Sequence, residues 1–227
     1  MHAGVDRWID EEDVARRLAG VRARISAVGD PHRVKIVAVT KGFGVEAVRA
    51  AAAAGLQECG ENYARELLAK AQVSPPGVRW HFLGAPQRNK MAALAPVVAL
   101  WQAADRLAVV ERLARVAPGA PLLVQVDVVG APGKAGCPPD EVAGLVERSR
   151  QLGLDVRGLM VVGPAGDPHG TQAAFATVAA LGRSLGLAEL SMGMTDDFEA
   201  AVAAGSTMVR LGRILFGPRP GRIAARR

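Results

Sequence analysis

The chain has 227 residues, of which 50% are hydrophobic and 22% charged, a composition typical of an ordered globular protein of one or two domains. Charges or glycines interrupt every apolar run well before about 18 residues, and the N-terminus lacks an apolar signal core, so we expect neither a membrane span nor export. The formal charge of +6 includes four arginines in the last ten residues. With only five Phe, three Trp and one Tyr, the sequence offers no set of aromatic residues on which nucleic-acid bases could stack. We therefore expect a protein that binds neither nucleic acid nor membrane and that is cytoplasmic.

The first predicted element is an amphipathic helix from about residue 10 to residue 27. Its apolar residues Val14, Leu18, Val21 and Ile25 recur at spacings of four, three and four. Eight short β-rich runs follow, at residues 34–40, 56–59, 79–83, 96–101, 122–128, 156–162, 189–192 and 207–211. Stretches of helical period lie between them, at residues 45–54, 63–71, 106–116, 140–152, 171–185 and 196–204.

Strands that alternate with helices indicate repeated right-handed βαβ units. The number eight favours a closed barrel over an open doubly wound sheet, which remains the alternative. We therefore predict an α/β fold, a single-domain (β/α)8 barrel of the TIM type with an extra N-terminal helix. The barrel would cover residues 10–218, between a flexible N-terminus at 1–9 and a basic tail at 219–227. The Pro/Gly-rich pieces at 74–77 and 129–133 are loop-sized, so no linker divides the chain.

The first predicted strand ends at a lysine, Lys41. The carboxyl ends of barrel strands are where such folds build their active sites, and an amine held there can form a Schiff base with an aldehyde. The plain alternative is a surface lysine that closes a strand.

The loops after the seventh and eighth predicted strands offer groups for an anion. Ser191, Met192 and Gly193 lead into a helix, which Thr195 or Asp196 would cap, and Gly212 and Arg213 follow the eighth strand. Barrels frequently bind phosphate between these two loops. An amine on one side of the mouth and a phosphate cradle on the other match the two ends of pyridoxal 5'-phosphate (PLP).

Several segments resemble the pyridoxal phosphate homeostasis protein family, which is related to the N-terminal barrel of alanine racemase. The resemblance runs from about residue 10 to about residue 219. The segments are Lys41 with its strand, residues 60–63, residues 80–84 with Gln87, Asn89 and Lys90, residues 191–194, residues 205–212, and Phe216 with Gly217.

The resemblance implies an alanine racemase N-terminal domain-like barrel that holds PLP as an internal aldimine on Lys41. It further implies that Ser191, Met192, Gly193, Gly212 and Arg213 surround the phosphate, that Arg210 faces the pyridine nitrogen, and that Asn62 and His81 lie nearby at the mouth. The implied role is intracellular PLP homeostasis, in which a monomeric carrier hands the cofactor to PLP-dependent apoenzymes.

Arg210 bears on whether the protein is an enzyme, because a guanidinium can only donate hydrogen bonds. A ring nitrogen that accepts from it stays unprotonated and is a weaker electron sink. We therefore assign no catalytic residue and keep a low-activity, PLP-dependent racemase-like enzyme as the alternative. The only tyrosine, Tyr63, is expected to serve packing at a helix start. Gly42 and Phe43 stand where the family usually has a further Lys-Pro, and the roles of Lys90 and Lys134 stay open.

The two cysteines, Cys59 and Cys137, are too far apart in sequence for a metal-ligand motif and form no disulfide framework. We expect reduced thiols, with Cys59 acting as a small buried hydrophobe. The histidines show no metal-ligand spacing either, so we predict no metal site.

Overall fold

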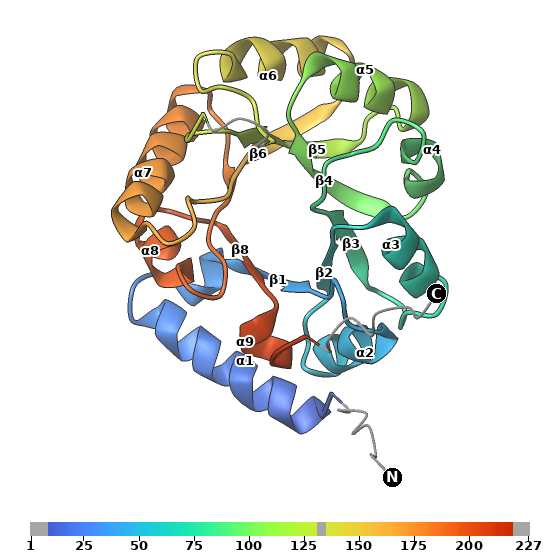
Figure 1. The fold of residues 1–227 in the computed structure, drawn as a ribbon, viewed down its shortest axis with the longest axis vertical. Coiled ribbons are helices and arrows are strands. Elements are labelled where there is room, and N and C mark those ends of the chain that lie inside the picture. The colour runs from blue at the N-terminus through green and yellow to red at the C-terminus, as the bar shows by residue number, and fades with distance from the viewer. Residues whose placement is uncertain (1–8, 131–134, 220–227) are drawn as a thin grey trace, which may run out of the picture.

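The computed structural model describes residues 9–130 and 135–219, in which eight parallel strands close into a barrel in chain order (Figure 1). Pairing of the first strand with the last, with Lys35 opposite Met208, closes the ring and confirms the predicted barrel over the open sheet. The strands are β1 (Lys35–Val39), β2 (Glu58–Glu61), β3 (Arg79–Phe82), β4 (Val98–Ala104), β5 (Pro121–Val126), β6 (Asp155–Val161), β7 (Glu189–Ser191) and β8 (Met208–Leu211).

Helices form an outer ring around the strands (Figure 1). All seven predicted helices are present: α1 (Glu11–Ser26), α2 (Val45–Ala53), α3 (Ala64–Ala71), α5 (Leu107–Val116), α6 (Val142–Gln151), α7 (Pro168–Ser184) and α8 (Phe198–Ala203). Three shorter segments were not predicted: η1 (Pro31–Arg33), α4 (Met91–Leu94) and α9 (Arg213–Phe216). Segments of three or four residues are too short to show a helical period.

The N-terminal helix α1 is tied to the barrel along its apolar face. Its four predicted apolar residues are all buried, and Asp10 caps it by accepting a hydrogen bond from the N–H of Glu12 at 2.9 Å. Near its other end, Arg24 binds both carboxylate oxygens of Glu199 at 2.7 Å, and its guanidinium lies 4.5 Å from the ring centroid of Phe198. These contacts hold α1 against α8.

The core has two parts because strand residues alternate between the barrel interior and the helix layer. In β3, Trp80 and Phe82 face the helices, whereas His81 points into the barrel. The interior apolar cluster consists of Val37, Leu100, Ala103, Leu123, Met160 and Met208. Because this cluster fills the centre of the barrel, a ligand has room only at one of its ends.

Most element boundaries differ from the prediction by a few residues, and two of these differences affect the site. Strand β4 continues to Ala104, three residues beyond the predicted end at Trp101, because the pairing with β5 extends past the last strongly β-forming residue. Helix α8 begins at Phe198 with Asp197 in the capping position, so the prediction that Thr195 or Asp196 caps it was wrong. The first change brings Gln102 into the barrel wall, and the second leaves Thr195 and Asp196 in a loop.

Both cysteines are buried and unpaired, as predicted. Burial raises the pKa of Cys59 to about 12 and that of Cys137 to about 11, so both stay protonated thiols at neutral pH. Among residues 9–130 and 135–219, no group of three or more His, Cys, Asp or Glu side chains could hold a metal ion.

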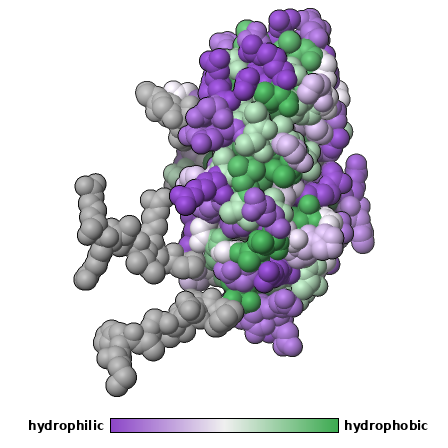
Figure 2. Space-filling view, turned by 90° about the vertical axis from the view of Figure 1, so that its right-hand side faces the viewer, coloured by the Kyte–Doolittle hydropathy of each residue, from purple (hydrophilic) through white to green (hydrophobic). Residues whose placement is uncertain are grey.

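The outer face seen in Figure 2 is mainly hydrophilic, with hydrophobic residues in separate patches between the charged ones. Within the described part of the chain, no helix combines the length and the apolar character needed to cross a membrane.

Candidate functional site

A pocket of about 190 Å³ opens at the carboxyl ends of the strands. Residues at the ends of β1, β2, β3, β6, β7 and β8 or in the loops that follow line it, together with Arg219 at the end of the described chain. Met160, Val162 and Met194 form part of its apolar wall. Its polar side chains are Lys41, Asn62, Thr195, Asp196, Arg210, Arg213 and Arg219.

Five of the nine predicted site residues meet in this pocket: Lys41, Asn62, Arg210, Gly212 and Arg213. They come from three separate loops and from β8, and only closure of the barrel brings them together. No role was predicted for Lys90 and Lys134, and Lys90 is not among the pocket residues. Lys90 is exposed in front of α4, and Lys134 lies outside the described residues.

The other four predicted residues lie beneath or beside the pocket and are not among its lining residues. Ser191 is the last residue of β7, and its hydroxyl is buried under Arg210, at 2.7 Å from Nη1. Met192 is buried in the helix-facing core, and a Cβ added at Gly193 would lie 2.6 Å from Ala201 Cβ. His81 lies in the barrel interior, bonded to Gln102 and Glu58. In the loop after β7, the residues that reach the pocket are Met194, Thr195 and Asp196.

A buried ion pair fixes the turn that carries Lys41. Lys70 of α3 binds the carboxylate of Glu61 at the end of β2, and its ammonium also donates to the carbonyl of Thr40 at 2.8 Å. Glu61 accepts a further hydrogen bond from the hydroxyl of Thr40 at 3.0 Å. On the other side of Lys41, Gly42 adopts φ +74°, which favours glycine, and its N–H donates to Glu66 at 2.9 Å. The position of Lys41 is therefore set by α3 as well as by its own strand.

The pKa of the Lys41 amine is lowered, first by burial and then by the positive charges of Arg219 and Arg210, while Glu61 acts in the opposite direction. A lowered pKa means that more of the amine is neutral near pH 7, and only the neutral amine is a nucleophile. The side chain of Arg219 packs over the turn, since a Cβ added at Gly42 would lie 3.1 Å from Arg219 Cδ. Arg219, the first residue of the segment predicted as a basic tail, thus lines the pocket.

Replacing Arg219 with glutamine is expected to raise the pKa of Lys41, because one of the two nearby cations is removed. The measurement is the pH dependence of acylation of Lys41 by an amine-selective reagent, followed by peptide mass spectrometry. The profile of the variant should move to higher pH, whereas acylation of the exposed Lys90 should not change. An unshifted Lys41 profile would show that Arg219 does not act on the amine.

Arg210 supplies a buried positive charge at the floor of the pocket. Its Nη1 donates to the carbonyl and the hydroxyl of Ser191, both at 2.7 Å, and its Nη2 donates to the carbonyl of Val161 at 2.8 Å. Burial lowers its pKa to about 10, although the nearby carboxylate of Asp197 acts in the opposite direction, so the guanidinium is still charged at neutral pH. Among the described residues no carboxylate bonds to it directly. A buried cation with neutral partners favours an anionic ligand nearby.

Further hydrogen-bonding groups at the mouth have no partner within the described residues. The Oδ1 atom of Asn62 is buried and unsatisfied, and the backbone N–H groups of Thr195, Asp196, Gly212 and Arg213 have no acceptor. A Cβ at Gly212 would lie 3.1 Å from the carbonyl oxygen of Val39, so this loop depends on glycine for its close approach to β1. Across the mouth, Arg213 and Asp196 form an exposed ion pair at 2.6 Å. The free backbone N–H groups suit the oxygens of a phosphate.

Comparison with known families and structures gives one consistent result. Residues 9–220 match the family described as alanine racemase, N-terminal domain. The pyridoxal phosphate homeostasis protein of Pseudomonas aeruginosa is 41% identical over 218 residues, which cover 92% of this chain and 95% of that protein. The protein of the same name from Escherichia coli K12 is 36% identical over 230 residues, covering 91% and 97% of the two chains.

Among solved structures, this chain is similar to PipY of Synechococcus elongatus with PLP bound. The TM-score is 0.80 at 35% sequence identity, and the match covers 90% of this chain and all of PipY (100%). The arginine decarboxylase of Paramecium bursaria Chlorella virus has a TM-score of 0.72 at 14% identity, which shows a shared fold alone.

Proposed function

The chain belongs to the alanine racemase N-terminal domain family and, within it, to the pyridoxal phosphate homeostasis proteins, and from this premise we propose that it binds PLP and acts in PLP homeostasis. The observation that carries the proposal is the pairing of a lysine amine of lowered pKa with a buried arginine cation in one pocket. PLP offers an aldehyde to the lysine amine and a ring nitrogen that can accept a hydrogen bond from the arginine. The orphaned Asn62 oxygen and the free N–H groups add hydrogen-bonding capacity for the same ligand.

In the proposed complex, Lys41 holds PLP covalently. The neutral amine adds to the aldehyde carbon, a carbon–nitrogen double bond forms, and one molecule of water leaves, so no oxidant or reductant is needed. Arg210 would donate to the pyridine nitrogen, and Thr195, Gly212 and Arg213 would hold the phosphate through a hydroxyl, backbone N–H groups and a guanidinium. We propose that Thr195 binds the phosphate in place of Ser191, Met192 and Gly193, because Thr195 lines the pocket and those three residues do not.

The pocket residues favour a carrier over an enzyme. A ring nitrogen that accepts from Arg210 remains unprotonated, which weakens the cofactor as an electron sink. A racemase needs a second proton carrier opposite the lysine. The side chain of Tyr63 is 53% exposed and His81 lies inside the barrel, and neither lines the pocket. We propose a monomeric carrier that passes PLP to PLP-dependent apoenzymes, and racemase-like turnover remains the second candidate.

Trapping with borohydride tests the proposed linkage. After incubation with PLP, the protein should absorb as a Schiff base, and reduction should fix the label on the peptide that contains Lys41. The exposed Lys90 is the internal control for nonspecific modification. A protein that stays colourless, or one labelled equally on both peptides, would contradict the proposal.

A racemisation assay separates the two candidate functions. The PLP-loaded protein is incubated with L-alanine and other L-amino acids, and the D-enantiomers are measured by chiral chromatography. We expect no turnover above that of free PLP. Turnover that is lost in the Lys41→Ala variant would favour the racemase-like enzyme.

A further inference from the structure

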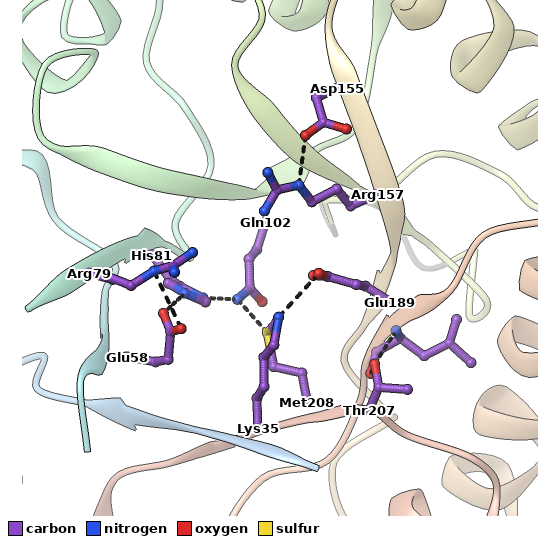
Figure 3. A network of polar contacts seen from close by, with 11 residues as sticks. Lys35, Glu58, Arg79, His81, Gln102, Asp155, Arg157, Glu189, Thr207 and Met208 are labelled. Carbon is purple, nitrogen blue, oxygen red and sulfur yellow. Dashed lines mark hydrogen bonds and ion pairs between the residues drawn. The ribbon is translucent and has the colours of Figure 1, made fainter. Parts of the chain in front are cut away.

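A chain of four hydrogen bonds crosses the barrel interior below the pocket. It runs from Nη1 of Arg210 to the hydroxyl of Ser191 at 2.7 Å, and from that hydroxyl to Oε1 of Gln102 at 2.7 Å. Nε2 of Gln102 lies 2.6 Å from Nδ1 of His81, and Nε2 of His81 lies 2.7 Å from the carboxylate of Glu58. Glu58 is the first residue of β2, so the chain ends at the face opposite the pocket. The part of it near that face is drawn in Figure 3.

The donors and acceptors of this hydrogen-bond chain can be arranged in only one direction. Arg210 is a donor only, so the oxygen of Ser191 accepts from it, and the hydroxyl proton of Ser191 then goes to Oε1 of Gln102. This orientation turns the amide N–H₂ of Gln102 toward His81 and toward the sulfur of Met208, which lies 3.1 Å away. The opposite amide orientation would leave the hydroxyl of Ser191 without an acceptor among its described neighbours.

The direction of the chain determines the state of His81. Because Gln102 donates to it, Nδ1 must be an acceptor, and the single ring proton sits on Nε2 and points to Glu58. This direction of the hydrogen bonds requires His81 to be in the neutral Nε2–H tautomer. A second ring proton would set two donors against each other at the 2.6 Å contact with Gln102.

Charged residues at the amino-terminal ends of the strands surround the far end of the chain (Figure 3). Arg79 of β3 lies 3.5 Å from Glu58, and Lys35 of β1 pairs with Glu189 of β7 at 3.2 Å. Arg157 and Asp155 of β6 pair with each other at 2.7 Å. Burial would raise the pKa of Glu58, but the hydrogen bond from His81 and the nearby cations hold it below its ordinary value, so Glu58 is an anion at neutral pH.

We propose that His81 and Gln102 are positioning residues for the ligand site. Through Ser191 they hold the guanidinium of Arg210 in place, and they link its charge to the carboxylate of Glu58. The aligned dipoles of the hydrogen-bond chain connect the buried guanidinium of Arg210 to the distant carboxylate of Glu58. The donors of Arg210 that face the pocket remain free for a ligand. A carboxylate placed directly against Arg210 would instead compete with an anionic ligand. The link to PLP rests on the proposed function, but the hydrogen-bond chain can be tested without any ligand.

The first test is nitrogen-15 NMR of the histidine side chains in the ligand-free protein at pH 7. Wild-type His81 should give the pattern of the neutral Nε2–H tautomer. In Gln102→Glu, position 102 can only accept, so His81 should become an imidazolium that donates to both carboxylates. The signal of His81 is assigned by its loss in His81→Asn or, if that variant does not fold, by its shift in Glu58→Gln. A charged wild-type His81, or the Nδ1–H tautomer, would overturn the proposal.

The second test is the affinity of the protein for PLP. Glu58→Gln removes the negative charge at the end of the hydrogen-bond chain without changing its shape, and binding should weaken about fivefold, the difference between a hydrogen bond to a charged and to a neutral acceptor. Gln102→Glu brings a negative charge to Ser191 and should weaken binding at least as much. Glu189→Gln removes a charge from the same face but lies outside the chain, and should change the affinity less than about twofold, as expected for a partly exposed ion pair.

The outcomes of the two tests are separable. Unchanged PLP affinity in both Glu58→Gln and Gln102→Glu would overturn the positioning role even if the tautomer is as stated. If the wild-type protein does not bind PLP, the proposed function fails. The tautomer of His81 still decides whether the hydrogen-bond chain from Arg210 to Glu58 exists.

Discussion

Replacing Lys70 with methionine is expected to destabilise the protein by about 3–5 kcal/mol, the usual effect of leaving one partner of a buried ion pair without its counter-charge. The side chains of Lys70 and Glu61 are 7% and 0% exposed, so solvent cannot compensate the carboxylate that remains. The substitution also removes the hydrogen bond to the carbonyl of Thr40, next to Lys41. The measurement is the free energy of unfolding in urea at pH 7.

The stability lost in Lys70→Met should depend on pH. Burial raises the pKa of Glu61 and Lys70 opposes that effect, so removing the lysine should raise the pKa further. A carboxyl whose pKa is higher in the folded than in the unfolded state costs stability as the pH rises above its ordinary value of about 4.3. The deficit of Lys70→Met should therefore shrink as the pH is lowered from 7 toward 5.

Two further variants serve as controls for the buried pair. Removing both charges in a Glu61→Leu, Lys70→Met double variant should recover much of the lost stability, because no buried charge is then unpaired. Glu66→Gln should cost less than about 1 kcal/mol, since this carboxylate is 36% exposed. A Lys70→Met protein as stable as the wild type at pH 7 would show that the pair does not support the turn.

Replacing Arg210 with methionine is expected to lower the affinity for PLP about 10- to 150-fold, which corresponds to the loss of a charged hydrogen bond worth about 1.5–3 kcal/mol. Arg210 is buried and held from below by Ser191 and Val161, so no other cation can take its place without rearrangement of the barrel interior. Affinity is measured by titrating the protein with PLP and following absorbance.

Arg213→Met is the matched control for Arg210. The side chain of Arg213 is 59% exposed and already paired with Asp196, so its loss should weaken binding only a few fold. Arg213→Met binding more weakly than Arg210→Met would place the main polar contact with PLP at the rim of the pocket and not at its floor.

The architecture could be predicted from sequence because it rests on local periodicity. The spacing of Val14, Leu18, Val21 and Ile25 identifies one buried helix face, and these four residues are all buried in α1. The alternation of strands and helices in turn predicts the barrel. Lys41, Gly212 and Arg213 follow from that topology, since residues at the ends of parallel strands must meet at one edge, whereas Asn62 and Arg210 were implied by the family resemblance.

The rest of the site depends on contacts that no local pattern shows. Ser191 is the last residue of β7 and points into the barrel, so a shift of a few residues along the chain separates it from Thr195, which lines the pocket. Arg219 looks like tail in a basic segment, and only its packing over Gly42, 177 positions earlier in the chain, makes it part of the site. The buried partnership of Lys70 with Glu61 is equally invisible, because sequence alone does not tell a buried charge from a solvated one.

The burial of both cysteines bears on how a reactive carbonyl compound could be kept intact. Thiolates add reversibly to aldehydes, and an accessible one would divert such a molecule into hemithioacetals. With thiols that ionise only at about pH 12 and pH 11 and lie inside the core, Cys59 and Cys137 are withheld from this side reaction. Amines are then the nucleophiles with which such an aldehyde would combine, and hydrolysis of the resulting Schiff base would return it chemically unaltered.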